Sequence, residues 1–148
     1  MQTLTLLDPV FVFQGLRWQV YLISLPASLP FLPASWRTRM LSTIGGGPVD
    51  PDEPVARMIS EATEHYAVKL PVPERITATQ LRGLGMPVYA ALAGRSVMHN
   101  GAHAAEVART EIPDPTVELW PDATHSLPME EAAQLDRAIL RFMASHDG

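Results

Sequence analysis

One histidine stands where it could move protons during a reaction. Residues 120–131 read WPDATHSLPMEE, which places His125 in a loop between a strand-like run and a helix-like run. A histidine side chain changes charge near neutral pH, so it can take a proton from a reacting group and return it later. On position alone, a helix-capping or surface histidine is the more common explanation. A catalytic role therefore depends on what the rest of the chain brings to His125.

Other reactive side chains are few. The chain contains no cysteine, which excludes disulfides, thiolate catalysis and thiolate metal sites. His99 and His103 are four residues apart, a spacing that suits a metal only if both lie on one helix. His99 precedes the helix that we expect from residue 101, and the sequence offers no third ligand. We therefore predict neither a metal ion nor a cofactor.

The composition is that of a soluble globular protein that does not bind nucleic acid. The 148 residues are 47% hydrophobic and 18% charged, with a net charge of −5 at pH 7. A nucleic-acid-binding surface would need a basic face. The N-terminus has neither a basic leader nor a small-residue cleavage site, and prolines at 26, 30 and 33 would break the most apolar stretch, 18–36. We predict a cytoplasmic protein without a membrane span.

Strand-like and helix-like runs alternate in the second half of the chain. Apolar runs at 86–93 and 116–120 predict strands, and a shorter run at 3–8 predicts a first strand that Asp-Pro ends. Helical patterns are expected between 77 and 85, at 101–112 and at 129–146. The last of these helices carries one apolar face, formed by Ala132, Leu135, Ile139 and Phe142. This alternation indicates an α/β fold with about three parallel strands and helices on one face of the sheet.

The segment between the first two strands has a different character. It is rich in proline and gives no strand signal. Two helices are expected in it, at 14–25 and 53–66, separated by a glycine- and proline-rich loop at 45–54. An apolar segment broken in this way is better suited to cover a site than to form part of a sheet.

The first predicted strand would be exposed along one edge. An apolar run that leads the chain leaves its backbone groups unpaired, unless another strand lies beside it. We therefore expect residues 3–8 to belong to a larger sheet. One interpretation is a non-catalytic interaction module that pairs through this strand with a second copy or with a separate N-terminal half.

The order of elements resembles the C-terminal portion of an α/β-hydrolase, from the sixth strand of that fold to its last helix. The matching stretches are LTLLDPV (4–10), QLRGLGMPVYAALAGRS (80–96), TVELWPDATHSLPMEEA (116–132) and LDRAILRFM (135–143). The resemblance implies a core strand at 1–8, a helical cap or lid at 9–76 and a C-terminal portion of the hydrolase core at 77–148.

The resemblance also implies roles for two side chains. His125 lies where the family carries its general base. Asp8 matches the end of the sixth strand, where some members carry the carboxylate that orients the histidine; its alternative role is to start a turn before Pro9. The more common acid position follows the seventh strand, and here no Asp or Glu stands between Gly94 and Glu106.

The nucleophile that the resemblance implies is absent from the sequence. Family members hold it in a Gly-x-Ser-x-Gly turn before the sixth strand, which corresponds to residues upstream of residue 1. Ser96, in GRSVM, is the nearest imitation, but it lacks the second glycine. We expect the complete protein to act on small apolar ester-type substrates, with lipase, dehalogenase or peroxidase chemistry left open. We expect the 148-residue chain alone to be inactive.

Overall fold

The computed structural model describes residues 2–24 and 73–147, together with separate positions between them (35, 36, 39, 42, 43, 54, 57, 58, 61 and 62). A three-stranded parallel sheet lies at its centre, with strand order β1-β2-β3. The strands are β1 (Leu4–Leu7), β2 (Val88–Ala93) and β3 (Pro115–Trp120). The prediction of a parallel α/β sheet with three strands is confirmed.

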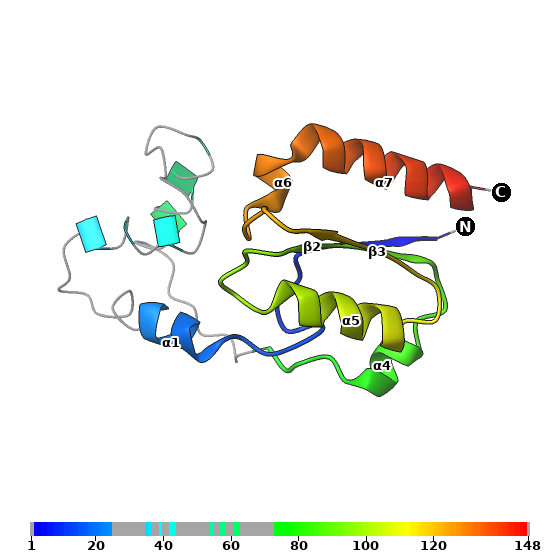
Figure 1. Ribbon diagram of the computed structural model, residues 1–148, viewed down its shortest axis with the longest axis horizontal. Coiled ribbons are helices and arrows are strands. Elements are labelled where there is room, and N and C mark those ends of the chain that lie inside the picture. The colour runs from blue at the N-terminus through cyan, green and yellow to red at the C-terminus, as the bar shows by residue number, and fades with distance from the viewer. Residues whose placement is uncertain are drawn as a thin grey trace.

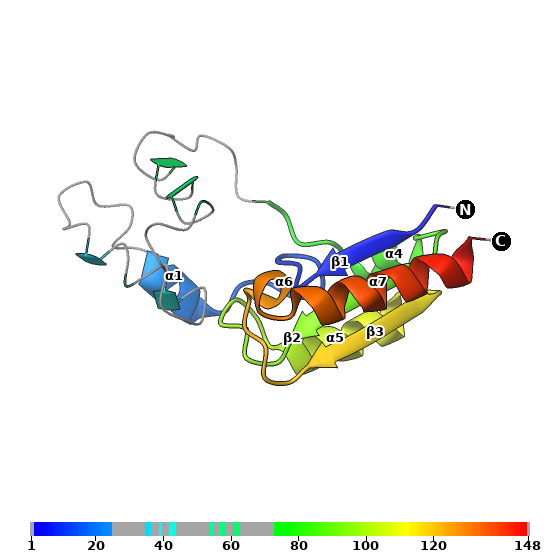
Figure 2. The same ribbon diagram turned by 90° about the horizontal axis from the view of Figure 1, so that it is seen from above.

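Helices cover both faces of this sheet, as Figures 1 and 2 show. On one face lie α4 (Ala78–Arg82) and α5 (Gly101–Glu111). On the other lie α6 (Leu127–Glu130) and α7 (Ala132–His146). The prediction of helices on one face only was wrong. The physical reason lies in β2, whose six residues are all buried and therefore need an apolar partner on each side.

Alternate side chains of β2 pack into two separate hydrophobic cores, one on each face of the sheet. Val88, Ala90 and Leu92 pack with α5, and Tyr89, Ala91 and Ala93 pack with α7. The α5 side is completed by Phe13, Leu81, Ala104, Ala105, Ala108 and Ile112, and the α7 side by Ala123, Leu127, Leu135, Ala138 and Phe142. These two layers hold the ends of the three strands in fixed positions.

Side-chain caps mark where helices α4 and α5 begin. Thr77 caps α4 in a reciprocal pair with Gln80, and the Asn100 side chain caps α5 by accepting from the backbone N–H of His103. The C-terminal helix departs from its prediction at 129–146. Its chain direction changes at Glu131, which separates α6 from α7, and Ala132 is exposed rather than part of the buried face.

The segment predicted as a lid is described only in part. The helix expected at 14–25 is α1 (Trp18–Ser24), which lies beyond the end of the sheet towards which the strands run (Figure 2). The loop predicted at 45–54 and most of the helix predicted at 53–66 lie outside the described residues. Among the helices that are described, none has the length and apolar character needed to cross a bilayer.

Strand β1 lies at one edge of the described sheet. Its four residues are only partly buried, whereas those of β2 are fully buried. The N–H of Leu4 donates to the Pro87 carbonyl just before β2 at 3.0 Å, and the N–H of Asp8 donates to the Ala91 carbonyl within β2 at 2.8 Å. Because the sides alternate along a strand, Thr5 and Leu7 point their N–H and C=O groups away from β2. No described strand pairs with that side.

Candidate active site

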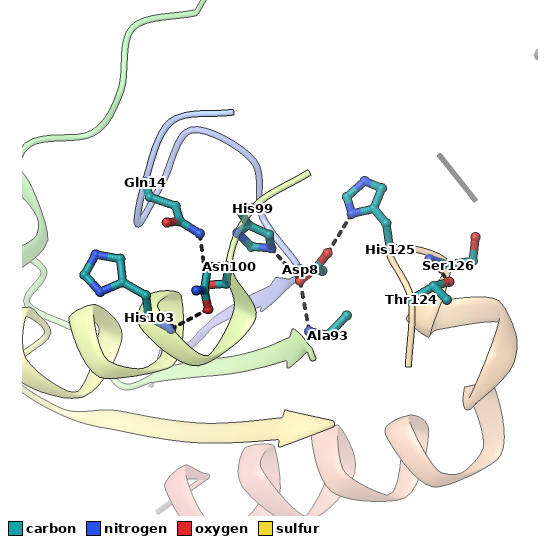
Figure 3. Close-up of polar contacts among 9 residues, drawn as sticks. All are labelled: Asp8, Gln14, Ala93, His99, Asn100, His103, Thr124, His125 and Ser126. Atoms are coloured by element: carbon teal, nitrogen blue, oxygen red, sulfur yellow. Dashed lines mark hydrogen bonds and ion pairs between the residues drawn. The ribbon is translucent and has the colours of Figure 1, made fainter. Parts of the chain in front are cut away.

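Three loops bring ionisable side chains together where the parallel strands end. Asp8 directly follows β1, His99 lies in the loop after β2, and His125 lies in the loop after β3. Figure 3 shows the Asp8 carboxylate between the two imidazole rings. The carboxyl ends of parallel strands are where open α/β sheets generally bind their ligands. The two residues predicted from sequence, Asp8 and His125, are thus in direct contact, and His99 joins them.

The Asp8 carboxylate is fully enclosed and accepts three hydrogen bonds. Oδ1 accepts from the Ala93 backbone N–H at 2.9 Å and lies 2.7 Å from Nε2 of His99. Oδ2 lies 2.7 Å from Nδ1 of His125. The side chain is 1% exposed, and its backbone has a positive φ of 40°, a region that aspartate adopts more readily than most residues. The carboxylate is therefore fixed in both position and rotation.

These contacts keep Asp8 ionised despite its burial. Burial alone acts to raise the pKa of Asp8, but the hydrogen bonds from His125 and Ala93 act against it, with a further contribution from nearby His99. The Ser96 hydroxyl also lowers this pKa, although it makes no hydrogen bond of regular geometry. The net result is a pKa below the ordinary value of 3.8. At neutral pH, Asp8 is a buried anion.

An ionised Asp8 determines the tautomer of His125. Because the carboxylate can only accept, Nδ1 of His125 carries the hydrogen and donates it to Oδ2. Nε2 of a neutral ring is then an unprotonated acceptor, and within the described part of the chain it makes no hydrogen bond. The side chain is 30% exposed, and Figure 3 shows its second ring nitrogen turned away from Asp8. This is the arrangement that a general base requires.

The loop that carries His125 is fixed by hydrogen bonds of the residues before and after the histidine. The Glu130 carboxylate accepts from the backbone N–H of Thr124 at 2.8 Å and from its hydroxyl at 2.5 Å. Leu127, buried against α7, donates its N–H to the Thr124 carbonyl. The ring of His125 thus projects from a turn that is fixed at Thr124 and anchored at Leu127.

A close backbone crossing brings the β2 and β3 loops together. The N–H of Gly94 donates to the Trp120 carbonyl at 2.8 Å, and that of Arg95 to the Ala123 carbonyl at 2.9 Å. A Cβ at position 94 would lie only 2.5 Å from the Pro121 carbonyl oxygen. The crossing therefore requires glycine at position 94.

His99 was not identified as a site residue from the sequence. It is 1% exposed, and its Nδ1 has no hydrogen-bond partner among the described residues. Burial lowers the pKa of His99; the nearby Asp8 charge acts in the opposite direction without reversing this, and His125 adds to the lowering. His99 is therefore neutral at pH 7 and uses Nε2 as a donor to Asp8. The available signal was its position in the loop after the strand predicted at 86–93, at the carboxyl edge of the sheet where Asp8 and His125 also lie.

Three further polar side chains near these loops do not serve as a base or a nucleophile in this arrangement. Ser96 is buried close to Asp8 and its hydroxyl is shielded from solvent, so a substrate carbonyl cannot reach it in this arrangement. His103 lies on the exposed side of α5 beside Glu106. Asn100, which follows His99, uses its side chain to cap α5 by accepting from the His103 N–H. In the part of the chain that the structure describes, no group of three or more side chains is arranged to hold a metal ion.

Known structures share this fold at low sequence identity. Carboxylesterase CesB of Bacillus subtilis matches with a TM-score of 0.79 and 18% identity, over 97% of this chain and 52% of that chain. Naproxen esterase of the same organism matches with a TM-score of 0.76 and 19% identity, over 94% and 50%. A meta-cleavage product hydrolase of Pseudomonas fluorescens matches with a TM-score of 0.72 and 11% identity, over 97% and 56%.

The comparisons with sequences give no relative. No protein-family model matches the chain, and no curated protein matches it. The likeness to solved structures therefore rests on the arrangement of helices and strands, and the chain spans about half the length of the structures it matches. The chain has the fold of the C-terminal portion of an α/β-hydrolase.

Proposed function

We propose that Asp8 and His125 are the acid and the base of an α/β-hydrolase that acts on ester-like substrates. The nucleophile would be supplied by residues upstream of residue 1. The observation that carries the proposal is the 2.7 Å contact between Oδ2 of Asp8 and Nδ1 of His125, which leaves Nε2 free on a side chain that is partly exposed. This contact joins the two residues that sequence reasoning selected independently of the structure.

The proposed chemistry follows from the free nitrogen. As a serine hydroxyl attacks the ester carbonyl carbon, Nε2 of His125 takes the hydroxyl proton, and the buried Asp8 anion stabilises the imidazolium that results. The imidazolium then gives this proton to the leaving alkoxide, which departs as an alcohol. Water hydrolyses the acyl-enzyme by the same route, with Nε2 as base. In this proposal, the hydrogen-bond donors that stabilise the oxyanion are supplied by the same upstream residues as the nucleophile.

Exposed apolar side chains on α1 support the proposal that the substrates are small and apolar. On α1, Val20 is buried, while Trp18, Tyr21 and Leu22 are more than half exposed. We propose that residues 9–76 form the cap and that α1 supplies part of an apolar pocket wall, as ligand sites usually require. The names of two neighbouring structures, a carboxylesterase and an esterase, favour esters over the other chemistries of this fold.

The experiment begins with the DNA upstream of the codon for Met1. An in-frame segment that encodes Gly-x-Ser-x-Gly would be joined to 1–148 and assayed with p-nitrophenyl acetate and butyrate. We expect turnover that His125→Ala and Asp8→Asn both reduce strongly, by about 10⁴-fold for loss of a triad member. His103→Ala is the matched control, because His103 is exposed and lies outside the site. Turnover that survives His125→Ala would refute the proposal.

The second candidate function is an interaction module that pairs through β1. It is favoured by the outward-pointing backbone groups of Thr5 and Leu7, which no described strand satisfies. The partner would be a second copy of the chain or a separately encoded N-terminal half. The two functions differ in their prediction for His125, since pairing through β1 needs no particular side chain at that position.

A further inference from the structure

We propose that His99 is a positioning residue that fixes the Asp8 carboxylate so that Oδ2 faces His125. The site then consists of a histidine, an aspartate and a second histidine, in which only His125 meets the substrate. The contact that carries the inference is the 2.7 Å approach of His99 Nε2 to Asp8 Oδ1, between two side chains that are each 1% exposed. The inference rests on the proposed pairing of Asp8 with His125.

The two oxygens of Asp8 have different surroundings. Oδ1 accepts from the Ala93 N–H at 2.9 Å and from His99 at 2.7 Å, whereas Oδ2 accepts from His125 at 2.7 Å. Two donors in different directions define the plane of a carboxylate better than one does. Without His99, Oδ1 would keep only the Ala93 N–H, and rotation of the carboxylate would draw Oδ2 away from His125.

The backbone around His99 is tied to the segment that follows β1. The Met98 carbonyl accepts from the N–H of Arg17 at 3.0 Å, and the Asn100 carbonyl accepts from the side chain of Gln14 at 2.9 Å. The Asn100 side chain in turn caps α5. The residues on both sides of His99 are therefore anchored, which gives the ring a defined direction towards Asp8.

Burial and charge make His99 a donor rather than a base. The charged or titratable groups that act on it among the described residues are Asp8 and His125. Burial disfavours the imidazolium, so His99 stays neutral, with its one hydrogen on Nε2. Its Nδ1 is shielded from solvent and cannot exchange protons with a substrate. His99 thus acts through Asp8 and not on the reacting atoms.

The test compares three substitutions at position 99 in the whole 148-residue chain. His99→Gln places an amide N–H near the former Nε2 and can still donate to Asp8. His99→Asn is polar too, but its amide reaches only as far as the former Nδ1, and His99→Leu has no donor. His103→Gln is the matched control on the exposed side of α5. Nitrogen-15 NMR would measure the ratio of the Nδ1–H to the Nε2–H tautomer of His125, with circular dichroism to confirm folding.

We expect the tautomer ratio to fall about threefold or more in His99→Asn and His99→Leu, as for loss of one hydrogen bond. His99→Gln and His103→Gln should keep the wild-type ratio. Folded Asn and Leu variants with the wild-type ratio would overturn the inference, as would a Gln variant that loses as much as Asn. Should the Leu variant not fold, the polar Asn and Gln variants decide the outcome.

An Asp8→Asn variant separates this inference from the proposed function. If Asp8 pairs with His125, the ratio falls about tenfold or more in Asp8→Asn, because the bond to a charged acceptor is lost. An unchanged ratio in Asp8→Asn would refute the proposed pairing of Asp8 with His125, whatever the results at position 99. A fall in Asp8→Asn together with no change in His99→Asn would leave the pairing intact and refute only the role of His99.

Discussion

Oδ2 of Asp8 lies 2.7 Å from Nδ1 of His125, although 117 residues separate them in the chain. Strands β1 and β3 bring them together, because both run in the same direction and end at the same side of the sheet with β2 between them. Asp8 is ionised and buried, and the imidazole presents its second nitrogen outwards. Burial of a carboxylate costs free energy unless donors surround it, and here the Ala93 N–H, His99 and His125 do so.

The first prediction concerns reactivity of the 148-residue chain alone. We expect no labelling by a fluorophosphonate probe and no histidine-dependent turnover of p-nitrophenyl acetate or butyrate, because Ser96, the serine that acts on Asp8, is buried. Mass spectrometry after incubation with the probe measures this, with an active serine esterase as the positive control. A label that maps to Ser96 and disappears in Ser96→Ala would show that this chain is an enzyme in its own right.

The second prediction concerns the crossing at Gly94. A Cβ there would lie 2.5 Å from the carbonyl oxygen and 2.7 Å from the Cα of Pro121, both of which are backbone atoms. We expect Gly94→Ala to lower the free energy of unfolding by about 1–3 kcal/mol, as overpacking does, and to move the His125 loop away from Asp8. Urea unfolding measures the first effect, and the His125 tautomer ratio measures the second.

Gly85 provides the control for this substitution. A Cβ at position 85 meets nothing within 4 Å. Gly85→Ala should therefore change the free energy of unfolding by no more than about 0.5 kcal/mol. Equal effects of the two substitutions would mean that the cost comes from the glycine-to-alanine change in general and not from the contact with Pro121.

Much of the fold could be predicted because its signals are local. The run VYAALA in β2 is apolar throughout, and its burial on both faces is what a central parallel strand requires. The same run also implied helices on both faces, a consequence that the sequence prediction missed. The break at Glu131 between α6 and α7 was missed for another reason. Periodicity records which side of a helix is apolar, but not a single-residue change in its direction.

The site could be predicted only in part. Asp8 and His125 were found through the order of elements, which the resemblance to a known fold supplied. His99 has no local signature, since its partner Asp8 is 91 residues away and the ring is buried for a polar contact rather than for an apolar one. A pattern of neighbours along the chain cannot show such a contact. It becomes visible only when β1 and β2 are placed side by side.

The third prediction concerns the loop that presents His125. Glu130 accepts both the N–H and the hydroxyl of Thr124. We expect Glu130→Gln, which keeps only one oxygen acceptor, to lower the free energy of unfolding by about 1 kcal/mol and to reduce the Nδ1–H tautomer of His125. Asp136→Asn is the control, because Asp136 is exposed on α7 and its substitution removes one negative charge, as Glu130→Gln does. Identical results for both variants would assign the effect to net charge.

The fourth prediction concerns pH. The pKa of His99 is lowered in the folded chain, chiefly by burial, from an ordinary value of 6.5. Below about pH 6.5 the unfolded chain binds more protons at this residue than the folded chain does. The contribution of His99 is therefore complete above pH 6.5 and is lost as the pH falls towards the lowered pKa. Asp8 follows the same rule at lower pH, starting near its ordinary value of 3.8.

Urea unfolding at about pH 7.5 and about pH 5.5 measures this effect. We expect the wild-type chain to lose stability over this interval and His99→Gln to lose less, because glutamine does not titrate. His103→Gln controls for removal of an exposed histidine and should behave as the wild type does. A His99→Gln variant with the same loss as the wild type would show that other groups cause the pH dependence.

The fifth prediction concerns the edge of β1. Thr5 points its N–H away from β2, so Thr5→Pro removes an outward donor and leaves the β1–β2 hydrogen bonds in place. We expect the wild-type chain to self-associate, and Thr5→Pro to weaken this association by about threefold to tenfold, as for loss of one backbone hydrogen bond. Thr5→Val keeps the N–H and is the matched control. Sedimentation velocity over a range of concentrations would measure the association. A wild-type chain that stays monomeric throughout, or equal association of the proline and valine variants, would show that β1 is not a pairing edge.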